Sequence, residues 1–105
     1  MSETRPKVTV VVPLYNTQRY ISQTLHSIAA QSFTDYEVVV VNDASTDCGP
    51  AIVLATMEAD ARIRMVTQEN RGLAGARNTG IRHARGSYIA LLDADDLWHP
   101  DKLSL

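Results

Sequence analysis

Four short apolar runs recur along the chain, with mixed polar and apolar stretches between them. They occupy residues 8–12, 37–41, 63–67 and 88–92. The first two consist mostly of valine, which is typical of parallel strands that are covered on both faces. Because proline cannot donate a sheet hydrogen bond, we expect the first strand to stop at Pro13.

Between these runs, apolar residues recur at the spacing of a helix. Residues 19–31 predict a first helix, which Asn16 or Thr17 would cap. Its apolar face consists of Ile21, Leu25 and Ile28. Pro50 suits the first turn of a second helix. The narrow apolar face of that helix consists of Ile52, Ala55, Thr56 and Ala59.

The second half of the chain continues this alternation. Residues 70–72, Asn-Arg-Gly, predict a turn, and residues 73–84 predict a third helix that Gly86 closes. A further helix is expected to begin within residues 97–103, with Pro100 in its first turn.

Strands that alternate with helices through short connections predict an α/β fold. The expected architecture is a three-layer sandwich, in which a mainly parallel sheet of Rossmann-like topology lies between helices. With 105 residues the chain suffices for one domain. We expect that domain at residues 8–105, preceded by an N-terminal tail at residues 1–7.

Composition narrows the class of protein. Hydrophobic residues make up 45% and charged residues 21%, which indicates a globular chain and not a disordered one. The formal net charge of -2 argues against a nucleic-acid-binding surface. The segment 62–85 is nevertheless locally basic and would attract an anion such as phosphate. Its arginines are Arg62, Arg64, Arg71, Arg77, Arg82 and Arg85.

The sequence also bears on location. Cys48 is the one cysteine, so the chain has no intramolecular disulfide, and a reducing compartment is expected. Neither a signal peptide nor an apolar run of spanning length is found, so we expect no membrane segment in this chain. A cytoplasmic location follows, with the inner face of the membrane as the alternative for a longer protein.

Chemically distinctive residues follow the predicted strands. Ligands of parallel sheets bind outside the carboxyl ends of the strands. The first strand leads to Tyr15, the second to Asp43, the third to residues 70–72 and the fourth to residues 93–96, Asp-Ala-Asp-Asp. Binding residues are therefore expected to collect at one edge of the sheet.

Together these residues favour a nucleoside-diphosphate site. Tyr15 would stack on a base, and Asp43 would accept a hydrogen bond from an imide N–H, which favours uracil. Each residue has a structural alternative: Tyr15 as a packing residue, Asp43 as a turn former, and Arg77 and Asn78 as members of a solvated helix face.

A divalent metal is the expected cofactor. Side chains alternate along an extended segment, so Asp93 and Asp95 project together, with the small Ala94 between them. The sequence has neither a dinucleotide-binding nor a P-loop glycine pattern. A cation with oxygen ligands, Mg²⁺ or Mn²⁺, would therefore neutralise the diphosphate.

Four segments in this order resemble family 2 glycosyltransferases. They are Val10–Asn16, Val41–Asp47, Asn70–Gly72 with Ala76–Gly80, and Leu92–Asp96. The resemblance covers nearly the whole chain, from Val8 to about Leu103. It implies the GT-A fold, a nucleotide-sugar donor and Mg²⁺ or Mn²⁺.

The resemblance also implies roles for individual positions. The nucleotide-sugar-binding set comprises Pro13, Tyr15, Asn16, Asp43, Asn70, Gly72, Arg77, Asn78 and Asp93. The metal ligands are Asp95 and Asp93, of which Asp93 also faces the ribose.

No catalytic residue is identified in this chain, because the family's general base lies in a later segment, as do its acceptor-binding elements. The chain is therefore expected to be the donor-binding half of a hexosyltransferase, inactive alone. The full enzyme would transfer sugar to a saccharide, lipid or small-molecule acceptor, with inversion.

Two other functions stay open at this point. A sugar nucleotidyltransferase would need a glycine-rich loop after the first strand, where residues 13–16 contain no glycine. A regulatory module of receiver type would need an acidic pair after the first strand and a lone aspartate after the third. Here the acids follow the second and fourth.

Overall fold

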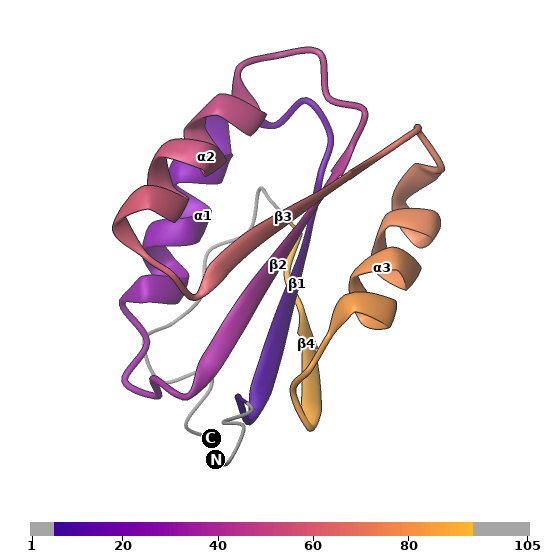
Figure 1. Ribbon diagram of the computed structural model, residues 1–105. Coiled ribbons are helices and arrows are strands. Elements are labelled where there is room, and N and C mark those ends of the chain that lie inside the picture. Colours follow the sequence, from indigo (N-terminus) through magenta and orange to yellow (C-terminus); the bar gives the residue numbers. More distant parts are fainter. Residues whose placement is uncertain (1–5, 94–105) are drawn as a thin grey trace.

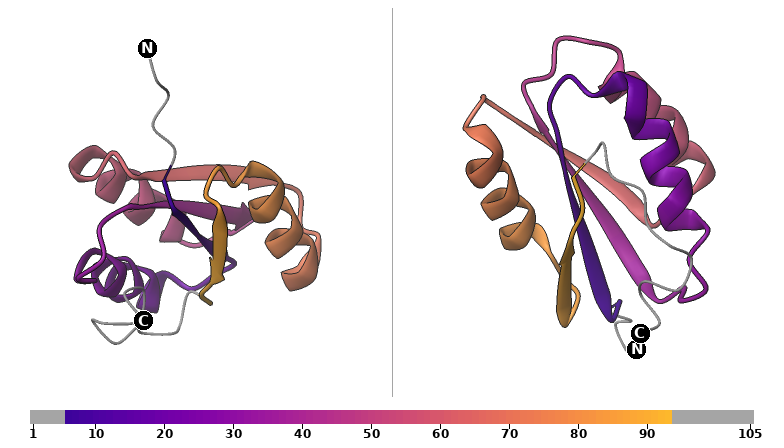
Figure 2. Two further views of the ribbon diagram at one scale, coloured as in Figure 1. Left: turned by 90° about the horizontal axis from the view of Figure 1, so that it is seen from below. Right: turned by 180° about the vertical axis from the view of Figure 1, so that it is seen from behind.

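The computed structural model describes residues 6–93, which form one parallel sheet with helices on both of its faces (Figures 1 and 2). The four strands are β1 (Val8–Leu14), β2 (Tyr36–Asp43), β3 (Ile63–Gln68) and β4 (Tyr88–Leu91). Their order across the sheet is β3-β2-β1-β4. The helices are α1 (Gln18–Ala29), α2 (Gly49–Ala59) and α3 (Gly72–His83). The predicted α/β fold is confirmed.

Alternation along the strands divides the core into two layers. The larger cluster combines Val10, Val12 and Leu14 of β1 with Ile21 and Leu25 of α1. The smaller cluster joins Val39 and Val41 of β2 to Ala76 of α3. Helices α1 and α2 therefore cover one face, and α3 covers the other (Figure 2).

The first strand does not stop at Pro13 as predicted. Pro13 pairs with Val41 of β2, and the strand continues to Leu14. Leu92 N–H donates to the Val11 carbonyl, so the odd residues of β1 direct their backbone groups toward β4. The β1–β4 pairing ends at Val11, and Pro13, which has no N–H, does not extend it.

Strand β4 is less buried than its composition predicts. Tyr88, Ile89 and Leu91 are 62%, 40% and 47% exposed, while Leu92, just after the strand, is buried. β4 lies at the edge of the described sheet and has a partner on one side. The apolar run therefore predicted the strand correctly but did not distinguish an edge from a centre.

Two further local predictions are corrected. In α2 the buried apolar residue is Val53, whereas Ala55 and Ala59 are exposed. Helix α3 ends at His83, and Gly86 does not close it. A side chain at Gly86 would place its Cβ 2.6 Å from the backbone nitrogen of Thr9. A close approach of two backbones therefore requires the glycine.

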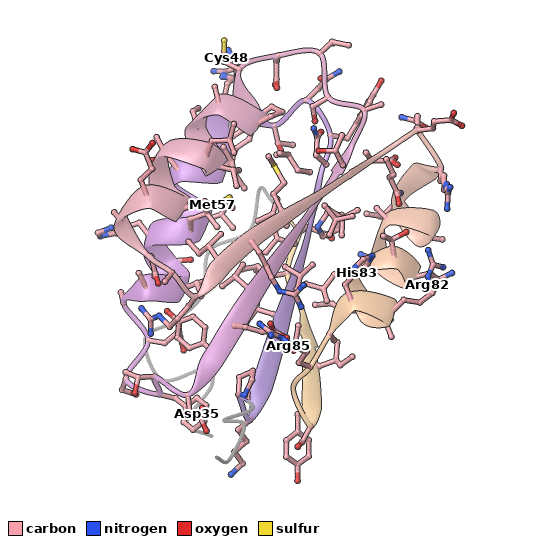
Figure 3. All side chains as sticks on the ribbon, viewed as in Figure 1. Asp35, Cys48, Met57, Arg82, His83 and Arg85 are labelled. Atoms are coloured by element: carbon pink, nitrogen blue, oxygen red, sulfur yellow. The ribbon has the colours of Figure 1, made fainter. Side chains whose placement is uncertain are left out.

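Glu37 organises the amino edge of the sheet. This residue is 4% exposed, and its carboxylate accepts hydrogen bonds from the Thr9 hydroxyl at 2.6 Å and the Arg85 N–H at 2.7 Å. The Arg64 guanidinium lies 3.2 Å away and the Arg85 guanidinium 3.4 Å away. Figure 3 shows Arg85 at this end of the molecule.

Burial alone would raise the pKa of Glu37. The hydrogen bonds from Thr9 and Arg85, together with Arg64, outweigh that effect and lower the pKa below its ordinary value. Glu37 is therefore a buried anion whose partners are supplied by the protein.

Internal partners also engage most of the basic segment. Arg64 and Arg85 share Glu37, Arg62 contacts Asp60 at 3.0 Å, and Arg77 contacts Asp93 at 2.9 Å. The anions that these arginines contact are carboxylates of the same chain. The clustering of arginine in the sequence thus does not by itself mark a phosphate-binding surface.

Candidate functional site

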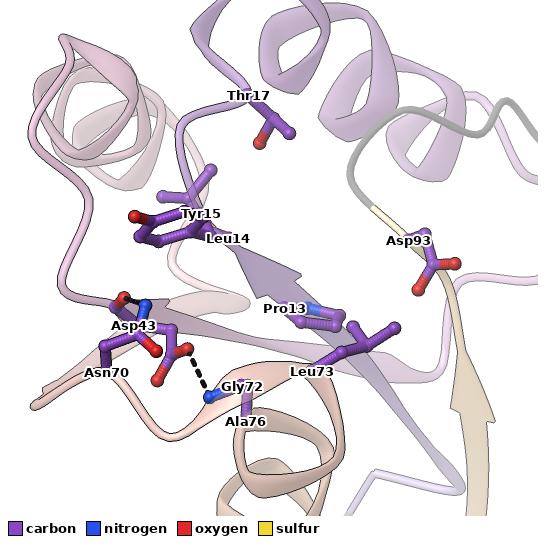
Figure 4. A pocket seen from close by; sticks show the side chains of 10 residues that line it. All are labelled: Pro13, Leu14, Tyr15, Thr17, Asp43, Asn70, Gly72, Leu73, Ala76 and Asp93. Atoms are coloured by element: carbon purple, nitrogen blue, oxygen red, sulfur yellow. Dashed lines mark hydrogen bonds between the residues drawn. The ribbon is translucent and has the colours of Figure 1, made fainter.

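A pocket of about 430 Å³ opens at the carboxyl edge of the sheet (Figure 4). Six of the predicted binding residues line it: Pro13, Tyr15, Asp43, Asn70, Gly72 and Asp93. They come from the ends of β1, β2 and β4 and from the loop before α3. The predicted convergence at this edge is therefore observed. The pocket walls also include Leu14, Thr17, Leu73 and Ala76, which sequence reasoning missed.

Three predicted residues do not line the pocket. Asn16 is exposed, and its side chain accepts the N–H of Thr46 at 2.8 Å, which ties together the loops after β1 and β2. Arg77 reaches the site indirectly through Asp93. Asn78 is exposed on α3.

Asp43 is almost completely enclosed, with 3% of its surface exposed. One carboxylate oxygen accepts the N–H of Arg71 at 2.8 Å and the side-chain amide of Gln68 at 2.9 Å. The other accepts the N–H of Gly72 at 3.0 Å. The carboxylate thus lies at the N-terminus of α3, where backbone dipoles favour a negative charge.

The loop that delivers these N–H groups depends on glycine. Gly72 has φ +79°, a conformation that is unfavourable for residues with a Cβ. Asn70 donates its side-chain amide to the Asp43 carbonyl at 3.3 Å. Where the sequence predicted a turn at residues 70–72, the structure has the end of the loop before α3 and the first residue of that helix, and this segment closes over Asp43.

Tyr15 projects from the loop after β1 and is 51% exposed, so one side of its ring is open to a ligand. The loop is attached to the loop after β2. Ser45 accepts the N–H of Asn16 at 3.2 Å and donates to the Leu14 carbonyl, also at 3.2 Å. These bonds flank Tyr15 on both sides in the sequence and restrict its backbone.

Asp47 fixes the starts of two helices at once. One carboxylate oxygen accepts the N–H of Gln18 at the start of α1 at 3.0 Å, and the other accepts the N–H of Gly49 at the start of α2 at 2.9 Å. The predicted capping of the first helix by Asn16 or Thr17 is wrong, because neither side chain makes that bond. Asp47 supplies it from 29 residues further along the chain.

Asp93 borders the pocket from the end of β4. Its carboxylate accepts a hydrogen bond from Arg77 at 2.9 Å, and both side chains are about one-third exposed. Within residues 6–93, two buried polar side-chain atoms have no hydrogen-bond partner, and they are the Thr17 hydroxyl oxygen and the Arg77 Nε. Their hydrogen-bonding capacity is unused.

The described residues include only part of the predicted metal centre. Among residues 6–93 no group of three His, Cys, Asp or Glu side chains is placed to hold a metal ion. Asp93 lies within this range, whereas Asp95, Asp96 and the predicted helix at residues 97–103 lie outside the described residues.

Comparison with known proteins places the chain in a family. Residues 9–105 match the model described as glycosyl transferase family 2. The chain belongs to this family. The site described above occupies the four segments on which the resemblance rests.

Two curated relatives illustrate the match. The putative teichuronic acid biosynthesis glycosyltransferase TuaG of Bacillus subtilis is 42% identical over 98% of this chain. The glycosyltransferase GlyA of Streptococcus pneumoniae is 46% identical over 86% of the chain. The chain spans 41% of the length of TuaG and 13% of that of GlyA.

Solved structures agree with the fold. The mannosyltransferase PcManGT of Pyrobaculum calidifontis, in complex with GDP-Man and Mn²⁺, has a TM-score of 0.83 and 42% identity. The alignment covers 90% of this chain and 29% of PcManGT. TarS 1–349 of S. aureus in complex with UDP has a TM-score of 0.86 and 32% identity, with 93% and 30% covered. The expected GT-A relationship is thereby confirmed.

No helix of residues 6–93 combines the length and the apolar character that crossing a membrane requires.

Proposed function

We propose that this chain is the donor-binding part of a metal-dependent glycosyltransferase. The enzyme would take a sugar from a nucleoside-diphosphate sugar, UDP-linked in our proposal, and transfer it with inversion to an acceptor hydroxyl. The observation that carries the proposal is the carboxyl-edge pocket, which Tyr15, Asp43 and Asp93 all line. The complexes of PcManGT with GDP-Man and of TarS with UDP support it.

The base would occupy the end of the pocket near Tyr15 and Asp43. The exposed ring of Tyr15 offers a stacking surface. The Asp43 carboxylate accepts the backbone N–H groups of Arg71 and Gly72, and it would also accept the imide N–H of uracil. Guanine also carries a ring N–H, whereas adenine has none at the matching position. Binding of UDP or GDP but not of ADP is therefore expected.

The diphosphate would lie toward Asp93. A carboxylate at the pocket wall is the type of ligand that Mg²⁺ and Mn²⁺ prefer, so Asp93 fits a metal site, with Asp95 as the second ligand. A cation bound there would stabilise the negative charge of the departing nucleoside diphosphate. Arg77 holds Asp93 at 2.9 Å and so orients this carboxylate.

Within residues 6–93, the acids that line the pocket are Asp43 and Asp93, and both are engaged. Neither is free to deprotonate an acceptor hydroxyl, since Asp43 is enclosed by N–H donors and Asp93 is paired with Arg77. We therefore expect the chain to bind the donor without transferring its sugar, and we place the general base outside these residues.

The two other functions that the sequence left open are less well supported. Pro13 and Tyr15 occupy the loop where a nucleotidyltransferase would need glycines. The receiver-type arrangement would require an acidic pair after β1 and an aspartate after β3, whereas residues 15–17 after β1 are Tyr-Asn-Thr and the residue after β3 is Glu69.

Calorimetry with UDP, GDP and ADP, each with and without Mn²⁺, tests the proposal. We expect UDP to bind, Mn²⁺ to tighten binding about tenfold, and ADP not to bind. The matched control is Asp35→Ala, which removes an exposed carboxylate at the opposite edge of the sheet and should leave UDP affinity unchanged. Equal binding of ADP and UDP, or UDP binding that a chelator does not weaken, would contradict the proposal.

A further inference from the structure

Thr17 has a hydroxyl group that does not cap the helix it precedes. It occupies the position before α1 at which a threonine normally accepts a backbone N–H of the first turn. Its side chain makes no such bond: Asp47 accepts the Gln18 N–H from across the loop, and the Thr17 backbone carbonyl accepts the N–H of Tyr20 at 2.9 Å. The threonine therefore contributes nothing to the helix end beyond its backbone.

The same hydroxyl oxygen is buried and has no hydrogen-bond partner within residues 6–93. Burying a hydroxyl without a partner destabilises a protein, whereas a valine of nearly the same shape would avoid that cost. Thr17 thus lowers the stability of the ligand-free chain at a position where an apolar side chain would fit. Such an unpaired polar group indicates a partner that the free chain does not contain.

The position of Thr17 indicates what that partner is. Thr17 lines the same pocket as Tyr15, Asp43 and Asp93 (Figure 4). Asp43 and Asn70 approach the pocket from the side of the sheet that α3 covers, whereas Thr17 belongs to the start of α1 on the other side. A ligand at this edge would therefore be held from both sides of the sheet.

We propose that Thr17 is a further donor-binding residue, whose hydroxyl forms a hydrogen bond with a ribose or phosphate oxygen of the bound nucleotide sugar. This inference rests on the proposed function and deepens it. It assigns a contact to a residue outside the predicted binding set.

The test compares Thr17→Val with Thr17→Ser in two measurements, namely thermal unfolding of the free chain and calorimetric titration with UDP. For Thr17→Val we expect opposite signs. The melting temperature rises by about 3–8 °C because an unpaired buried hydroxyl is removed. UDP affinity falls about three- to tenfold because one hydrogen bond is lost. Thr17→Ser keeps the hydroxyl and should bind UDP within about twofold of the original chain.

Thr56→Val provides the matched control. The Thr56 hydroxyl lies in α2 and donates to the Ile52 carbonyl at 3.0 Å, away from the pocket. This variant should leave UDP affinity unchanged.

Two results would overturn the inference alone: a lower melting temperature for Thr17→Val, which would make the hydroxyl structural, or unchanged UDP affinity in that variant. If the original chain binds neither UDP nor GDP, the proposed function fails and the inference falls with it. The two failures are therefore distinguishable.

Discussion

Strand β2 carries two enclosed carboxylates, one near each end, and they are stabilised in different ways. Glu37 at the amino edge and Asp43 at the carboxyl edge are 4% and 3% exposed and lie on the same face of the strand. Glu37 is neutralised by the side chains of Arg64 and Arg85. Asp43 is held mainly by backbone N–H groups and carries no ion pair in the described chain.

This difference separates a structural charge from one that is available for binding. Arginine side chains neutralise Glu37 and fill the space around it, so its carboxylate serves the fold. Backbone N–H groups stabilise Asp43 without cancelling its charge. Asp43 still lines the pocket. We therefore expect substitutions at the amino edge to change stability and those at the carboxyl edge to change nucleotide binding.

The largest effect is expected from Glu37→Ala. It removes the acceptor for the Thr9 hydroxyl and the Arg85 N–H, which remain in the interior. Because Arg64 and Arg85 are partly exposed, water can hydrate them again, and we expect a loss of about 2–4 kcal/mol in the free energy of unfolding. Urea titration measures this loss in the free energy of unfolding. Glu58→Ala removes an exposed glutamate as the control, and equal stability of the two variants would show that the Glu37 network contributes little.

Asp43→Asn should lower both the stability of the fold and the affinity for UDP. The new amide group would meet the N–H of Arg71 or Gly72 where an acceptor is needed. We expect a loss of about 1–3 kcal/mol in stability and at least a tenfold loss in UDP affinity, by urea titration and calorimetry. UDP binding that survives in a folded Asp43→Asn chain would exclude Asp43 as the base-binding residue.

Asp95→Ala should weaken binding without weakening the fold. If Asp95 is a metal ligand, UDP affinity in Mn²⁺ should fall about tenfold, to the value measured with chelator. Carboxylates close together repel one another when no cation is bound, so stability should be unchanged or slightly higher. A clear loss of stability would instead indicate a structural role for Asp95.

The smallest effect is expected in the pH dependence of stability. The pKa of Glu37 is lowered in the folded chain, so its contribution is present above the unfolded-state pKa of about 4.3 and is lost as pH falls through the folded value. The pKa of Asp60 is lowered in the same direction by its hydrogen bond from Arg62. Urea unfolding between pH 3 and pH 7 should show a shallower acid slope for Glu37→Gln. An identical slope would assign the acid sensitivity to Asp60 and other groups.

The sequence predicted the elements and the edge at which the site lies, because both depend on local patterns. Runs of valine identify strands, and parallel strands bring their carboxyl ends together. It did not predict the bond from Gln18 to Asp47 or those from Arg64 and Arg85 to Glu37, since they join residues 27 to 48 positions apart. It also offered Asn16 or Thr17 as the cap of the first helix, whereas in the structure Thr17 makes no side-chain capping bond and Asn16 binds Thr46.

The unequal lengths of two neighbouring strands have a further consequence. β1 has seven residues and β4 has four, so the end of β1 at Pro13 and Leu14 extends past its neighbour. Exposed strand edges invite other chains to add by backbone pairing, which leads to aggregation. Pro13 offers no donor on this side, so a foreign strand cannot complete its pairing there. The residue that forms one wall of the pocket thus also protects its entrance from closure by strand addition.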